Sequence, residues 1–66
     1  MLKSHFWVYL KEKQKMRTGP GTDWASLGEA EALTQLLVVG EEGKWYKVFY
    51  GDYFAYVLKS SVVVYQ

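Results

Sequence analysis

Two alternating runs in the C-terminal half of the chain, "KWYKVFY" and "YFAYVLK", constrain the fold most, because only Gly51-Asp52 separates them. Each run repeats with a period of two, which indicates a β-strand. A two-residue connection of this kind is typical of a tight hairpin. Tyr46 and Val48 share one face of the first run, and Ala55 and Val57 share one face of the second. The segment is therefore predicted to form an antiparallel hairpin.

The N-terminal part of the chain alternates in the same way, and we expect one strand from His5 to Arg17. Its inward side begins with Phe6, Val8 and Leu10, and Met16 rejoins that side. The opposite side carries a basic residue at every second position, namely Lys11, Lys13, Lys15 and Arg17. Such a row either protects a strand edge or binds anions such as nucleic acid. The formal net charge of +1 favours the first interpretation.

Residues 24–40, "WASLGEAEALTQLLVVG", carry conflicting signals. Ser26 with Glu29 fits a helix capping box, and "EAEALTQLL" has high helix propensity. Gly28 would disturb the first helical turn, and the "LLVV" that follows favours a strand. We therefore expect a short helix around residues 29–36 that leads into a strand from about Leu36 to Val39.

Short strands joined by tight turns predict a mainly all-β fold, and closing such a sheet removes its exposed edges. We expect residues 1–66 to form a single domain, a small barrel of five to six strands. Half of the residues are hydrophobic and none is a cysteine, so apolar packing must hold the fold together. No apolar run approaches the roughly 20 residues of a membrane span, and the sequence has no secretory signal. We expect a cytoplasmic protein if the chain is complete, or a cell-envelope or extracellular one if it is part of a longer protein.

The sequence offers little for catalysis. No residue spacing orients the single histidine, His5, as a general base, and there is no cysteine nucleophile. The acidic residues are scattered, so no metal site or cofactor is predicted. Residues 19–23, "GPGTD", lack the lysine that a phosphate loop requires after its second glycine. Instead, Pro20-Gly21 is predicted to form the centre of a type II turn.

Aromatic residues, 18% of the chain, are the strongest positive signal. A core of this size cannot hide all of them, so some rings should reach the surface, where Tyr and Trp often make contacts. Trp45 is expected to point outward beside aromatic residues of the returning strand, and Trp24 follows the glycine-rich loop. These rings either form one wall of a binding groove or cap the open ends of a small barrel. A homodimer through exposed rings is a further alternative that the sequence leaves open.

The order of these features resembles the bacterial Src-homology-3-like domain. The resemblance rests on "MRTGPGTDW", a following "LG", then "VVGEEGKWYKV" and a closing "YV", and it covers about residues 14–63. It implies a small β-barrel without catalytic activity, preceded here by an extra N-terminal strand in residues 1–13. The chain departs from the family pattern at three positions: Gln14 stands for an apolar residue, Ala32-Leu33 replaces a Lys-Gly turn, and Ala55 replaces a glycine. The loop after Gly28 is therefore expected to differ from that of the family.

Domains of this family usually bind ligands, often the peptidoglycan of the bacterial cell wall or its peptide bridges, and other members mediate protein–protein contacts. The resemblance thus implies a non-catalytic module that binds cell-wall peptide or glycan. The predicted site is an aromatic groove with Asp23 as its polar anchor, formed by Asp23, Trp24, Trp45, Tyr46 and Tyr56. The alternative is a protein-interaction module or a small stand-alone inhibitor that binds a protein partner. Nucleic acid is the least favoured ligand, because the net charge is nearly neutral.

Overall fold

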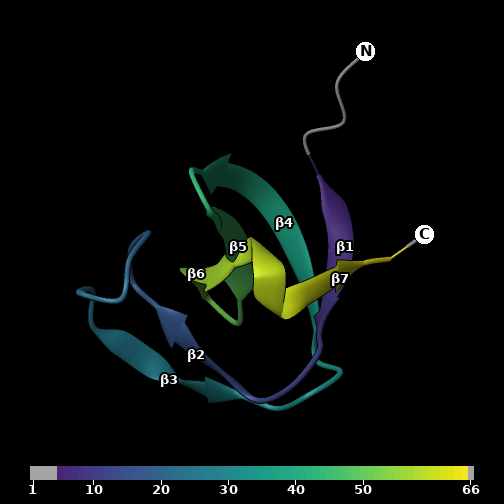
Figure 1. Ribbon diagram of the computed structural model, residues 1–66, viewed down its shortest axis with the longest axis horizontal. Helices are drawn as coiled ribbons and strands as arrows, with labels where there is room; N and C mark the ends of the chain where they lie inside the picture. Colours follow the sequence, from purple (N-terminus) through teal and green to yellow (C-terminus); the bar gives the residue numbers. More distant parts are fainter. Residues whose placement is uncertain (1–4, 66) are drawn as a thin grey trace.

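The computed structural model describes residues 5–65 and contains one antiparallel sheet of seven strands (Figure 1). The strands are β1 (Phe6–Leu10), β2 (Gln14–Arg17), β3 (Ser26–Ala30), β4 (Gln35–Glu42), β5 (Trp45–Tyr50), β6 (Tyr53–Leu58) and β7 (Val62–Val64). A 3₁₀ turn, η1 (Lys59–Ser61), leads from β6 into β7. Across the sheet the strands follow the order β3-β2-β6-β5-β4-β1-β7. The mainly all-β prediction is confirmed, with seven strands where five to six were expected.

The hairpin of β5 and β6 forms as the alternating runs predict. Six consecutive residue pairs join the two strands. Gly51 has a φ of 65°, a left-handed conformation that suits a two-residue connection. Val48 of β5 and Val57 of β6 have no exposed surface, whereas Phe49 and Phe54 on the opposite side are exposed. The two-residue period therefore separates core from surface on both strands.

The predicted strand from His5 to Arg17 is wrong in one respect, because it breaks at residues 11–13 into β1 and β2. The Leu10 N–H donates to Thr34 O at 3.1 Å, and the Lys11 N–H donates to Ser61 O at 3.0 Å. These bonds hold the end of β1 between two distant segments. β1 pairs with β4 and β7, whereas β2 pairs with β3 and β6. The chain therefore turns a corner between two parts of the sheet.

This corner also breaks up the predicted row of basic residues. Lys13 lies outside both strands, and its Nζ is 3.6 Å from a carboxylate oxygen of Glu29 and 3.9 Å from one of Glu31. Lys15 is the direct cross-strand partner of Glu29 in the β2–β3 pair. The carboxylates reduce the positive potential along this edge, which disfavours an anion-binding stripe.

The helix predicted around residues 29–36 does not form, and a turn at Ala32-Leu33 joins β3 directly to β4. The Ser26 Oγ accepts a hydrogen bond from the Gly28 N–H at 3.0 Å, so it does not cap a helix. Gly28 has a φ of 126°, which no α-helix allows. In addition, β4 pairs on both sides, with β1 and with β5. Non-local strand pairing therefore overrides the local helix propensity.

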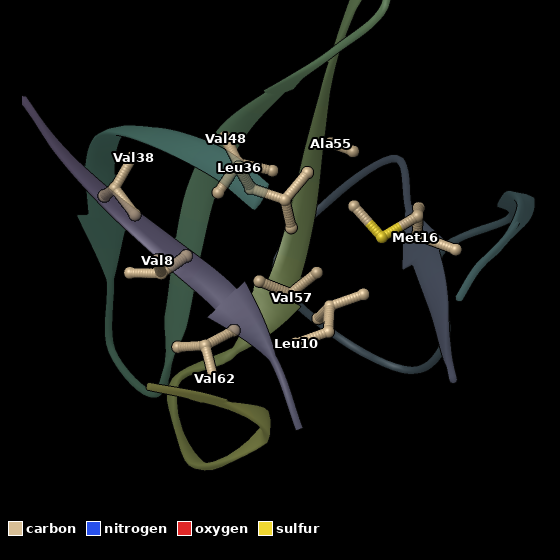
Figure 2. Packing of buried hydrophobic residues seen from close by; sticks show 10 residues of the cluster. Val8, Leu10, Met16, Leu36, Val38, Val48, Ala55, Val57 and Val62 are labelled. Atoms are coloured by element: carbon tan, nitrogen blue, oxygen red, sulfur yellow. The ribbon is translucent and has the colours of Figure 1, made fainter. Parts of the chain in front are cut away.

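The core is apolar and lies on the concave side of the sheet, where side chains from several strands meet (Figure 2). Its buried members are Val8, Leu10, Met16, Ala30, Leu36, Val38, Val48, Ala55, Val57 and Val62. Val8, Leu10 and Met16 have no exposed surface, which confirms the predicted inward side of β1 and β2. Within residues 5–65 no polar side chain is buried, so the fold depends on apolar packing.

Candidate functional site

The loop between β2 and β3, residues 18–25, carries Asp23 and Trp24. Its base is closed by a hydrogen bond from the Thr18 N–H to Ala25 O at 2.9 Å. Asp23 is exposed and forms no ion pair within residues 5–65. Trp24 is also exposed, with 52% of its surface open to solvent. The loop therefore exposes a carboxylate and an indole ring at consecutive positions of the chain.

The turn inside this loop differs from the prediction. The Gly21 N–H donates to Gly19 O at 2.9 Å, which closes a three-residue turn centred on Pro20. The predicted type II turn is wrong, because it would require a positive φ at Gly21. The glycines that have a positive φ in the described part of the chain are Gly28, Gly43 and Gly51. Proline suits the observed turn because its ring holds φ near the value that this turn needs.

The Trp24 ring packs directly on the backbone of Gly19. A Cβ placed on Gly19 would lie 2.1 Å from Trp24 Cδ2, far inside van der Waals contact, and Gly19 itself is buried. The Arg17 guanidinium donates a hydrogen bond from Nη1 to the Trp24 carbonyl oxygen at 3.1 Å. The ring is therefore held against the loop on one side while part of its surface stays accessible.

The outward side of β5 and β6, which we call the outer face, is rich in aromatic residues. Its members are Trp45, Lys47, Phe49, Phe54, Tyr56 and Leu58. The rings of Phe49 and Phe54 stack with their centroids 4.8 Å apart and their planes 24° apart. Lys47 Nζ lies 4.4 Å from the centroid of the Phe54 ring, a cation–π contact. Phe49 and Phe54 are both nearly half exposed, so the stack is a surface feature.

A cross-strand pair connects the outer face to the loop. Arg17 at the end of β2 is the direct partner of Tyr56 on β6, so the two side chains share one side of the sheet. Arg17 also binds the Trp24 carbonyl. Lys47 pairs with Tyr56 from the other side, and Trp45 is its neighbour two residues along β5. These contacts place Trp45 and Tyr56 on one side of the sheet, and Arg17 on that same side binds the backbone of the loop that carries Asp23 and Trp24.

Tyr46 is the predicted site residue that lies elsewhere. It follows Trp45 on β5 and therefore points to the opposite side of the sheet. Its ring contacts Phe6 edge-to-face, with centroids 5.5 Å apart, and packs against the buried core. Lys59 Nζ lies 5.2 Å from the Tyr46 ring centroid and also pairs with the Glu41 carboxylate. Tyr46 thus contacts the edge of the core, away from the outer face.

The outer face and the adjoining end of β2 also carry residues that were not among the predicted site residues, namely Arg17, Lys47, Phe49 and Phe54. A sequence signal existed for Phe49, because it shares the outward side of β5 with Trp45. The role of Arg17 had no such signal, because its pairing with Tyr56 joins segments far apart in the chain. The surface therefore contains two cations in addition to the rings.

The chemistry of the site suits binding. Within residues 5–65 no group of three or more His, Cys, Asp or Glu side chains is placed to hold a metal ion. Exposed rings offer apolar contact area, and the two cations and Asp23 offer charge-assisted hydrogen bonds. In the same range, no helix has the length and apolar character needed to cross a membrane.

Comparison with known proteins identifies a family that the chain matches. The family described as "Bacterial SH3 domain" matches residues 15–63, which is most of the chain. The matched segment begins in β2 and ends in β7, so β1 lies ahead of it. No curated protein matches the chain.

Proposed function

The chain belongs to the bacterial SH3 domain family, and from this premise we propose that it is a non-catalytic binding module that recognises cell-wall peptide or glycan. Family membership supports a binding role in general. The observation that carries the finer proposal is the outer face, where exposed aromatic rings lie beside Lys47, Arg17 and the Trp24 loop.

The chemistry of this surface supports a ligand that is partly apolar and partly anionic. Aromatic rings such as Trp45 and Tyr56 pack against the apolar faces of sugars or against peptide backbone. Lys47 and Arg17 would attract the carboxylates that peptidoglycan peptides carry. Asp23 would anchor an amide or an amine of the same ligand. In this proposal Tyr46 supports the fold and makes no ligand contact.

Retention on purified, insoluble peptidoglycan tests the proposal. We expect the native protein to sediment with it, and Trp45→Ala or Trp24→Ala to remain mostly in the supernatant. Trp7→Ala is a matched control, because Trp7 is 50% exposed, close to the 52% of Trp24, but lies on β1 outside the proposed site. Peptidoglycan stripped of its peptides by an amidase separates peptide from glycan recognition. The proposal fails if the native protein is not retained, or if all three variants are retained equally.

A protein ligand is the second candidate function, either for an interaction module or for a stand-alone inhibitor. One observation favours it: Phe49 and Lys47 both pack against the Phe54 ring, which leaves less ring face for a sugar. Cross-linking through a photoreactive residue at Phe49 would then capture a partner from cell lysate, and Trp45→Ala would abolish capture. Retention on peptidoglycan together with no captured partner would reject this candidate.

A further inference from the structure

The tip of the β5–β6 hairpin and the strand β3 flank a pocket that the proposed function does not use. Its volume is about 370 Å³. It is lined by Leu27, Tyr50, Gly51, Asp52 and Tyr53. The two tyrosines are direct cross-strand partners, and alternation along β5 and β6 places them on the side opposite the outer face. The pocket is therefore separate from the site proposed above.

Two tyrosine rings supply the aromatic part of this pocket. Tyr50 is half-buried and packs against the core, and its hydroxyl donates a long hydrogen bond to Glu29 O, at 3.5 Å. This bond connects the hairpin to β3 and helps to hold the Tyr50 ring in place. Tyr53 is 65% exposed, so its ring is accessible. A ligand can therefore meet ring surface with little ordering of the protein, which lowers the entropic cost of binding.

Asp52 is the single charged residue among those that line the pocket. It is exposed and forms no ion pair within residues 5–65. The hairpin turn does not require its charge, because Gly51 takes the left-handed conformation and asparagine also suits such turns. A carboxylate and the π faces of tyrosine rings both attract a cation. The pocket is therefore complementary to a positive charge.

We propose that this pocket binds the guanidinium group of an arginine side chain on a peptide. A guanidinium is planar, so it can stack on a tyrosine ring while two of its N–H groups donate to the Asp52 carboxylate. A lysine ammonium is a compact, more strongly hydrated charge that cannot combine stacking with a two-pronged contact. Leu27 is 40% exposed and offers apolar contact to the methylene groups of the arginine.

A titration of the native protein with a single capped amino acid tests the ligand chemistry. The probe is arginine blocked at both ends, and backbone amide shifts of the ¹⁵N-labelled protein report where it binds. We expect shifts at Leu27, Gly51 and Asp52, with a dissociation constant on the order of 10 mM, because an ion pair at an open surface is weak. Capped citrulline, which has the shape of arginine without its charge, should bind at least about fivefold more weakly. Capped lysine should bind at least about twofold more weakly than arginine.

A charge-removing variant with a matched control tests the role of Asp52. Asp52→Asn keeps a residue that suits the turn and should weaken arginine binding at least about fivefold. Glu42→Gln should bind like the native protein. Glu42 is also exposed and forms no ion pair in the described part of the chain, but it lies beyond the opposite end of β5. Peptidoglycan retention of Asp52→Asn should match that of the native chain, so this proposal and the proposed function can fail separately.

Two variants of Tyr53 test the aromatic contact without disturbing the core, because most of this side chain is exposed. Tyr53→Ala should weaken arginine binding, and Tyr53→Phe should keep it, since the ring and not the hydroxyl makes the contact. Any one of four results overturns the proposal: no arginine-induced shifts at the pocket, equal binding of citrulline, equal binding of lysine, or unchanged arginine binding by Asp52→Asn.

Discussion

The contact between Gly19 and Trp24 gives the most specific prediction. In Gly19→Ala, the new methyl carbon would lie 2.1–2.5 Å from three carbons of the indole. Carbon atoms normally approach to about 3.5–4.0 Å, so the ring must retreat by more than about 1 Å. Overpacking of this kind costs about 1–3 kcal/mol in unfolding free energy. Expelling the ring into solvent instead would forfeit roughly 1–1.5 kcal/mol of apolar burial. Either response lowers the stability.

The same substitution should behave differently when the ring is absent. In a Trp24→Ala background the methyl group has space, and Gly19 does not have a positive φ, so Gly19→Ala should be neutral or stabilise by about 0.4–1 kcal/mol. The double-mutant cycle should therefore give a coupling energy of roughly 2 kcal/mol between the two positions. Urea denaturation followed by far-ultraviolet circular dichroism measures all four proteins without depending on the Trp24 signal.

A second glycine of the loop provides the matched control for this cycle. A Cβ on Gly21 would lie 3.4 Å from Trp24 Cδ1, which is ordinary contact, and Gly21 does not have a positive φ. Gly21→Ala should therefore change the unfolding free energy by less than about 0.5 kcal/mol. The reasoning is refuted if Gly19→Ala is equally destabilising with and without the Trp24 ring, or if Gly21→Ala is as harmful as Gly19→Ala.

Three further predictions concern the core, the site and the hairpin. Leu10→Ala empties a fully buried position and should lower the unfolding free energy by about 2–5 kcal/mol in urea titrations; a loss below about 1 kcal/mol would contradict the packing described. Tyr46→Ala should lower the melting temperature without reducing peptidoglycan retention of the folded fraction. Tyr56→Ala should reduce retention without lowering the melting temperature. If Tyr46→Ala reduces retention and leaves the melting temperature unchanged, Tyr46 belongs to the site. Gly51→Ala should destabilise by about 1 kcal/mol because its φ is 65°, and Gly51→Asn should recover part of that loss in the same melts; equal melting of both variants would argue against a left-handed residue there.

The parts of the fold that the sequence predicts are those determined by neighbouring residues. The β5–β6 hairpin follows from a two-residue connection and a strict alternation, so its register and its two faces were predictable. The helix prediction failed because the local signal in residues 29–36 competes with pairing to β1 and β5, which are distant in the chain. Ala32-Leu33 was interpreted as a departure from the Lys-Gly turn of the family, yet the structure has a turn at these two residues.

The candidate site likewise has parts that the sequence predicts and parts that it does not. Trp45 and Tyr56 could be predicted to share the outer face, because both follow from alternation within one hairpin. Their connection to Trp24 depends on Arg17, whose pairing with Tyr56 no short-range pattern encodes. The type II turn at Pro20-Gly21 was wrong for a related reason. The observed turn leaves Gly19 in direct contact with the indole ring, a packing requirement that turn statistics do not include.

The position of β1 matters for the design of a truncated or fused form of this protein. The family match begins at residue 15, so a fragment cut to the match would omit β1. That strand is not an appendage, because it pairs with β4 on one side and β7 on the other. The shortened fragment would also lose the core residues Val8 and Leu10, which have no exposed surface. The smallest portable unit of this fold is therefore longer than its recognisable family segment and must include Phe6–Leu10.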